Sequence, residues 1–208
     1  NNHKSLGINL QRISEYNSFT LVQGSQLDFA KVELTATQKD ALTTSSAFNN
    51  ATRPQGKHYD YEVDSTVIAL FAGIEDYILN KNLNLFADTR AEFIKYDYSN
   101  NMISGNTRED GSKCGFGGCY YNRPSDRTDD FNEISARIGI ITSYESVNYF
   151  AQISLGFRPA QINEAYRLQK KQNVTDLDSE TLTILEVGTR YDWQSLSGSL
   201  SLYQSKKK

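Results

Sequence analysis

Two neighbouring stretches of the chain show the pattern that decides its fold. They read Glu133-Ile134-Ser135-Ala136-Arg137-Ile138-Gly139-Ile140 and Asn148-Tyr149-Phe150-Ala151-Gln152-Ile153-Ser154-Leu155-Gly156-Phe157-Arg158. Apolar side chains alternate with polar or small ones in both stretches. Because successive side chains of a strand point to opposite faces, this period of two predicts strands with one apolar and one polar face. The break at residues 143–147 suits a tight turn, so the two stretches are predicted to form a hairpin.

The same alternation recurs in residues 6–10, 19–35, 59–71, 83–93, 185–191 and 196–202, which gives about eight strands and no helix of ordinary length. In residues 19–35 the apolar positions change register between Phe29 and Ala30, which a β-bulge would explain. The longest apolar series is Tyr59, Tyr61, Val63, Val67, Ala69 and Phe71. The intervening acids Asp60, Glu62 and Asp64 are expected to point to a lumen or a loop mouth.

The connections between these strands alternate strictly between two sizes. Residues 14–18, 80–82, 143–147 and 192–195 form short breaks, whereas residues 36–58, 99–129 and 159–180 form long ones. Loops in soluble domains are typically about four to six residues long, with no such alternation. Outer-membrane barrels have short periplasmic turns and long extracellular loops. The sequence therefore predicts an all-β fold, an antiparallel transmembrane β-barrel segment with short periplasmic turns and long extracellular loops.

A sheet that crosses lipid must turn its apolar face outward, which leaves polar side chains for the lumen. Arg137, Arg158, Glu186 and Arg190 are predicted to face the lumen. They would form a structural ladder across neighbouring strands, which we favour, or contact a plug or guide a ligand.

Aromatic residues gather near the predicted strand ends. These are Tyr59, Tyr61, Tyr77, Tyr96, Tyr98, Tyr144, Tyr149, Phe157, Tyr191 and Trp193. Amphipathic rings favour the two interfaces of a bilayer, although tyrosine is also simply a good strand former. Taken together with the alternating loop lengths, the clustering favours a bacterial outer membrane, with its lipid as one partner.

Composition and charge exclude several other classes of protein. The 208 residues carry a net charge of −3, which gives no electrostatic case for nucleic acid or an anionic surface. Apolar content of 38% and charged content of 23% exclude a disordered tail. The chain begins at Asn1 without an apolar signal core, so we expect a mature, processed or fragmentary chain.

Cys114 and Cys119 flank four residues in the longest loop, where an extracellular location favours a disulfide over two free thiols. A metal site is not expected, because the two histidines, His3 and His58, are distant and the cysteine spacing is not that of a zinc site. No set of residues marks a catalytic centre or a cofactor site. The sequence therefore indicates a protein that is not an enzyme.

Residues 156–168 read Gly156-Phe157-Arg158-Pro159-Ala160-Gln161-Ile162-Asn163-Glu164-Ala165-Tyr166-Arg167-Leu168. This run resembles a signature of TonB-dependent outer-membrane receptors, in which a strand ends in Gly-Phe-Arg and a loop continues with Glu-x-Tyr-Arg. Downstream, Glu180 and the run Glu186-Val187-Gly188-Thr189-Arg190 resemble the next strand of that family. The sequence departs from the family pattern in the order Arg158-Pro159-Ala160 and at Ala165.

The resemblance implies an energy-coupled receptor and transporter for a scarce nutrient, first a ferric siderophore, with haem or vitamin B12 as lesser alternatives. It also implies a TonB energy-coupling complex that acts through a plug. No plug, energy-coupling box or terminal aromatic residue is found, so residues 1–208 are expected to be an internal piece of the barrel domain, without the plug and the remaining strands. Two rivals are a small closed outer-membrane barrel with a structural or adhesion role and a soluble lipocalin-like binder.

Overall fold

The computed structural model describes residues 1–80, 82–172 and 178–208. Its main element is an eight-stranded antiparallel sheet in the order β1-β2-β3-β4-β6-β7-β9-β10. The strands are β1 (Asn2–Tyr16), β2 (Phe19–Gln38), β3 (Gly56–Asn80), β4 (Leu83–Asn100), β6 (Arg127–Tyr144), β7 (Val147–Arg158), β9 (Glu180–Trp193) and β10 (Leu196–Lys207). The all-β fold and its eight strands are as the alternation predicts.

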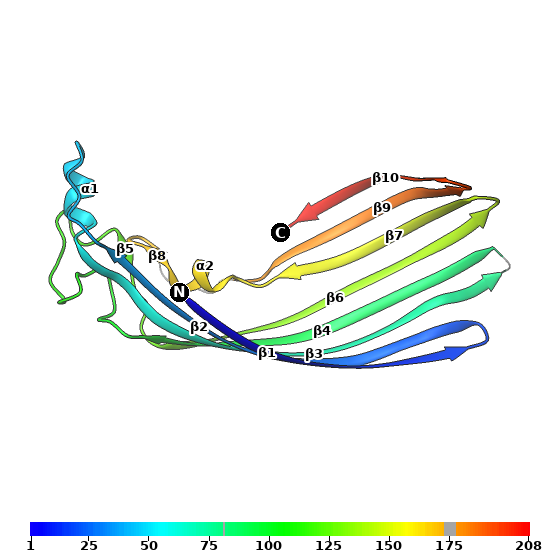
Figure 1. Ribbon diagram of the computed structural model, residues 1–208, viewed down its shortest axis with the longest axis horizontal. Helices are drawn as coiled ribbons and strands as arrows, with labels where there is room; N and C mark the ends of the chain where they lie inside the picture. Colours follow the sequence, from blue (N-terminus) through cyan, green and yellow to red (C-terminus); the bar gives the residue numbers. More distant parts are fainter. Residues whose placement is uncertain (81, 173–177) are drawn as a thin grey trace.

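The sheet curves into an open trough, with β1 and β10 at its two edges (Figure 1). All short turns lie at one end of the trough, and the long connections gather at the other end (Figure 1). Four small elements interrupt the long connections: α1 (Ala47–Thr52), β5 (Tyr121–Asn122), α2 (Ile162–Tyr166) and β8 (Leu168–Gln169). Among the described residues, no helix is both long enough and apolar enough to cross a membrane.

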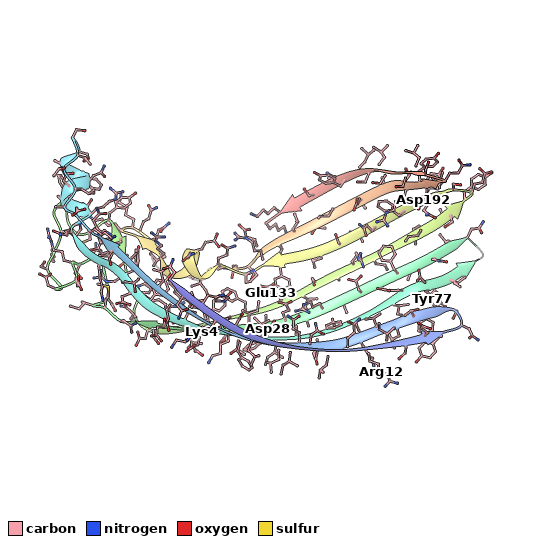
Figure 2. All side chains as sticks on the ribbon, viewed as in Figure 1. Lys4, Arg12, Asp28, Tyr77, Glu133 and Asp192 are labelled. Carbon is pink, nitrogen blue, oxygen red and sulfur yellow. A yellow bond between two sulfur atoms is a disulfide. The ribbon has the colours of Figure 1, made fainter. Side chains whose placement is uncertain are left out.

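Side chains stand out from both faces of the sheet (Figure 2). Those of the outer face include an exposed apolar band, with Leu6, Ile8, Leu10, Phe29, Ile68, Leu70, Phe93, Ile134, Ile138, Ile153, Leu155, Leu185, Val187, Leu200 and Leu202 among its members. Water would disfavour so much contiguous apolar surface, whereas lipid hydrocarbon suits it. Toward the loops this band ends in charged residues. On the same face, the next outward residue after Phe29 on β2 is Lys31, and the next after Phe93 on β4 is Lys95. The strands therefore continue beyond the apolar band. β3 has 25 residues, whereas a strand needs roughly 9–11 residues to cross the bilayer.

The expected bulge between Phe29 and Ala30 is wrong. β2 pairs with β1 without any shift from Tyr16↔Phe19 to Asn2↔Glu33, and its pairing with β3 shifts only between Ala36 and Thr37. The change in apolar register instead marks a change of environment along one regular strand. Phe29 faces outward in the apolar band, whereas Leu34 is buried on the inner face against the loops.

The predicted orientation of β3 is also wrong. The alternation predicts that the series from Tyr59 to Phe71 faces lipid, but Tyr61, Val63 and Ala69 are at most 1% exposed on the inner face. The outward apolar residues of β3 are Ile68 and Leu70. The acids Asp60, Glu62 and Asp64 accordingly lie on the outer face, beyond the apolar band, where Lys31 Nζ lies 2.5 Å from Glu62 Oε2. The loops cover the inner face of β3, so at this end the inner face is the apolar one.

The inner wall is fitted together by phenylalanine rings that lie over glycines of neighbouring strands. Gly139 on β6 is the direct partner of Phe86 on β4, and Gly188 on β9 is the direct partner of Phe150 on β7. A Cβ atom on Gly139 would lie 2.4 Å from Phe86 Cζ, and one on Gly188 would lie 2.5 Å from Phe150 Cζ. The aromatic rings therefore occupy the space that a side chain would need, an arrangement known to fix strand register.

We expect Gly139→Val and Gly188→Val each to destabilise the wall by about 1–3 kcal/mol, because the added side chain must displace a ring and a neighbouring carbonyl. Thermal unfolding of the full-length protein in detergent measures the loss. Gly156→Ala is the matched control, since a Cβ atom there meets nothing within 4 Å. An unchanged melting temperature for both valine variants would contradict this account of the wall.

Candidate functional site

The three long connections fold together into one loop cluster at the end of the trough away from the short turns (Figure 1). The loop cluster is formed by residues 39–55, 101–126, 159–172 and 178–179 of these connections. β5 of the second connection pairs with β8 of the third, through Tyr121↔Gln169 and Asn122↔Leu168. The backbone N–H of Tyr120 donates to the carbonyl of Thr52, 2.8 Å away, which joins the first connection to the second. The cluster is therefore a folded unit rather than three separate loops.

Tyrosine rings attach the loop cluster to the inner face of the wall. The Tyr166 ring of α2 stacks on Tyr98 of β4, with ring centroids 4.3 Å apart, and meets Tyr61 of β3 at 6.5 Å. The Tyr166 hydroxyl donates to Asp129 Oδ2 on β6, 2.6 Å away. Burial, followed by the hydrogen bond to Asp129, raises the pKa of Tyr166, which stays protonated and acts as a donor. These contacts fill the space between α2 and three strands.

This placement corrects part of the predicted aromatic belt. Tyr59, Tyr61, Tyr96 and Tyr98 are buried on the inner face under the loop cluster, and Phe157 packs against the same core. Tyr77, Tyr144 and Tyr149 are exposed at the end with the short turns, as rings at a bilayer interface would be. The side chain of Trp193 lies outside the described residues. Tyrosine alternation alone does not distinguish a lipid interface from a core made by loops.

The signature residues Arg158, Glu164 and Glu180 form one ion-pair cluster at the base of the third connection. Arg158 Nη2 lies 3.2 Å from Glu164 Oε1, and Arg158 Nε lies 3.0 Å from Glu180 Oε2. Lys207 Nζ of β10 lies 2.7 Å from the same Glu180 oxygen. The hydrogen bonds from Arg158 and Lys207 lower the pKa of Glu180 to about 2. Glu164 also accepts from the backbone N–H of Gln161, 3.0 Å away, and so caps α2.

The remaining signature residues play separate parts. The Arg167 guanidinium carbon lies 5.9 Å from the centre of the Tyr59 ring, and Gly188 lies beneath Phe150 in the wall. Gly156 borders open space, and nothing in the structure explains its identity. The signature therefore describes how the third connection leaves β7, folds as α2 and is tied back to the wall.

Arg123 is the central residue of the loop cluster, and sequence reasoning missed it. Its side chain is 1% exposed. Nε donates to the Ile103 carbonyl at 2.7 Å, Nη2 to the Thr107 carbonyl at 2.8 Å, and Nη1 to the His58 carbonyl at 3.2 Å. One guanidinium thus satisfies carbonyls from the second connection and from β3. Nη2 also donates to the Thr107 hydroxyl at 2.9 Å and to the Arg108 carbonyl at 3.3 Å. Because four of these five acceptors are backbone carbonyls, no pattern of side chains in the sequence marks the site.

Cys114 and Cys119 are joined by a disulfide with an S–S distance of 1.97 Å. Both cysteines are buried in the core of the loop cluster. The six-residue ring turns sharply, because Phe116, Gly117 and Gly118 all have positive φ, at 55°, 76° and 128°. The ring presents Phe116 at the surface, where it is 61% exposed.

The polar residues predicted for the lumen do not form one network. Arg137 Nη2 lies 2.7 Å from Asp88 Oδ2, and Glu186 accepts from Gln152 Nε2 at 2.6 Å. Arg190 lies over Phe150, with its guanidinium carbon 5.4 Å from the ring centre. Arg137, Gln152 and Arg190 all line an open pocket of about 390 Å³ on the inner wall. Arg158 is instead part of the ion-pair cluster at the loops.

A second polar group lies on the inner wall and was not singled out from the sequence. Arg90 Nη2 donates to Gln26 Oε1 at 2.9 Å, and Arg90 also pairs with Glu92. Only the inward alternation of these residues could have indicated it. Away from the loop cluster the inner wall thus carries polar side chains, and Arg90, Arg137 and Glu186 each have a polar partner there.

The arrangement of an apolar outer band, a polar inner wall and long folded loops agrees with comparisons to known proteins. The family model described as TonB dependent receptor-like, beta-barrel, matches residues 2–208. The chain belongs to the TonB-dependent receptor β-barrel family. This confirms the resemblance seen in the signature residues, and it places the chain in the outer membrane of Gram-negative bacteria. No curated protein matches the sequence.

Solved structures of TonB-dependent receptors share the fold at low identity. The copper transporter OprC superposes with a TM-score of 0.66 at 13% identity, covering 97% of this chain and 30% of its own. The closed form of the ferric-catecholate import receptor Fiu from K12 E. coli superposes with a TM-score of 0.66 at 14% identity, and the match covers 99% of this chain and 31% of Fiu. The ferric yersiniabactin uptake receptor FyuA from Yersinia pestis superposes with a TM-score of 0.66 at 11% identity, and the match covers 99% of this chain and 28% of FyuA. The chain thus spans about a third of the length of these receptors.

The two rival interpretations lose their structural basis. A small closed barrel requires its first and last strands to pair, but β1 and β10 lie at opposite edges of the described sheet. A lipocalin-like binder requires a polar outer surface, but the outer face carries the exposed apolar band.

We expect Arg123→Met to lower the opening free energy of the loop cluster by on the order of 3 kcal/mol, since several buried carbonyls lose their donor. Hydrogen exchange at the amides of Gly105 and Cys119, which donate within this cluster, reports the change. Lys171→Met serves as the control, because Lys171 is exposed. Wild-type protection at both amides would show that Arg123 is dispensable.

The ion-pair cluster should loosen in acid. The pKa of Glu180 is lowered by Arg158 and then Lys207 from an ordinary value of 4.5 to about 2, so its contribution is complete above 4.5 and is lost as the pH falls toward 2. Hydrogen exchange in α2, corrected for the intrinsic rate, should therefore accelerate as the pH falls from 4.5 toward 2. Glu180→Gln should flatten this pH dependence, whereas Glu133→Gln, on another part of the wall, should retain it.

Proposed function

We propose that this chain is part of the barrel of an energy-coupled outer-membrane receptor that captures a scarce nutrient and passes it inward. The observation that carries the proposal is the loop cluster itself. It is a folded unit that lies over the inner face of the wall, above a polar lumen surface. A ligand that arrives from outside would meet the loop cluster first and the polar wall second.

The nutrient that we propose is a ferric siderophore. Two kinds of support favour it: the signature residues from Gly156 to Gly188, and structural neighbours whose names specify ferric-catecholate import, ferric yersiniabactin uptake and a siderophore receptor. The neighbour named as a copper transporter keeps copper as an alternative cargo. Identities of 11–14% to these receptors support only the shared fold, so the ferric siderophore is our proposal for the cargo.

The proposal includes partners outside these 208 residues. The remaining strands would close the barrel by pairing with the free edges of β1 and β10, and a plug would occupy the lumen beside Arg137, Glu186 and Arg190. A TonB complex would drive rearrangement of the plug. The protein would act as a transporter and not as an enzyme.

The full-length receptor, expressed in a strain without competing receptors, should take up iron-55 from a ferric siderophore panel. A proton uncoupler should abolish uptake and leave binding intact, because coupling acts after capture. Replacing residues 39–55, 101–126 and 159–179 together should weaken ligand binding. Uptake that persists with the uncoupler, or unchanged affinity after the replacement, would contradict the proposal.

A further inference from the structure

Three aromatic rings from two of the long connections meet at the surface of the loop cluster. The Phe48 ring of α1 lies 5.5 Å from the Phe116 ring and 6.1 Å from the Tyr120 ring, both in edge-on geometry. Phe48 is 38% exposed and Phe116 is 61% exposed. Exposed aromatic clusters of this kind are uncommon away from binding surfaces. Their burial would be favourable upon contact with a ligand.

Two cations border these rings. The Arg53 guanidinium carbon lies 4.1 Å from the centre of the Tyr120 ring. The Lys170 ammonium donates to the Phe116 carbonyl, and the backbone N–H of Lys170 donates to the Tyr120 carbonyl at 2.9 Å. Within the described ranges, neither cation forms an ion pair with a carboxylate. Phe48, Arg53, Phe116, Tyr120 and Lys170, here called the tip patch, therefore combine aromatic surface with uncompensated positive charge.

The scaffold beneath the tip patch holds it in a defined shape. The disulfide closes the ring that carries Phe116, and the backbone N–H of Cys119 donates to the Asn106 carbonyl at 2.8 Å. Thr52, which is fully buried, accepts through its carbonyl from the N–H of Tyr120. A preformed site of this kind loses little conformational entropy when a ligand binds.

We propose that the tip patch is a binding site for a ligand that is both aromatic and anionic. Rings of the ligand would pack against Phe48 and Phe116, and its negative charge would lie beside Arg53 and Lys170. An uncharged ligand would gain only the ring contacts, and an aliphatic anion only the charge. The inference rests on the proposed function, because it selects the chemical class of chelate that the receptor captures.

Calorimetry on the full-length receptor in detergent tests this with three probes. They are a trianionic iron(III) chelate of a synthetic tris-catechol, a neutral iron(III) tris-hydroxamate chelate, and iron-free 2-naphthoate. We expect the trianionic chelate to bind tightest. Phe116→Ser and Arg53→Gln should each weaken it by roughly five- to tenfold, the scale of removing one aromatic or cation interaction. Ile103→Ser and Lys171→Gln, an exposed apolar residue and an exposed cation outside the patch, should match the wild type.

The naphthoate probe separates this inference from the proposed function. If iron uptake fails but naphthoate binds and weakens in both patch variants, the site stands and the cargo is wrong. If uptake occurs and the patch variants bind the trianionic chelate like the wild type, the tip patch is overturned while the receptor function stands. Equal affinity for the trianionic and neutral chelates, or no binding of any probe, would also overturn it.

Discussion

The structure depends on one constraint, which is that backbone N–H and C=O groups within lipid find no partner except each other. Only neighbouring strands can satisfy them, so the wall is a continuous antiparallel sheet and its side chains must divide between two media. The outward side chains of Ile138 and Ile153 are therefore apolar, and the inward side chains of Arg137 and Gln152 are polar. The alternation in the sequence is the direct consequence of this constraint.

The constraint acts only within the bilayer, and this explains where sequence reasoning succeeded and failed. The eight strands and the alternation of short and long connections were predictable, because each strand crosses lipid once. The orientation of β3 was not predictable. Beyond the membrane the loop cluster covers the inner face. Tyr61 and Val63 are therefore buried against the loops, whereas Ile68 is exposed to lipid on the outer face. A period of two gives the positions that share a face, but it does not give the medium that this face meets.

The residues of the candidate site also divide into those that the sequence marks and those that it does not. Residues whose partners are side chains at characteristic spacing, such as Cys114 with Cys119 or Arg158 with Glu164, could be singled out from the sequence. Arg123 could not, since nearly all of its acceptors are backbone carbonyls, at residues 58, 103, 107 and 108. The tip patch was equally hidden, because its members are spread from residue 48 to residue 170 and meet only when three connections fold together.

The interactions between the loop cluster and the wall also limit how this part of the receptor can move. The stacking of Tyr166 on Tyr98, the Tyr166–Asp129 hydrogen bond and the Arg158–Glu164 ion pair all join the third connection to strands. Opening this connection as a hinged lid would expose Tyr61 and Tyr98 and leave Asp129 without the hydroxyl that donates to it. Breaking these interactions costs free energy that a small ligand must supply through its own binding. The loop cluster is therefore best described as a rigid extension of the wall, which presents a fixed surface to whatever reaches the mouth of the barrel.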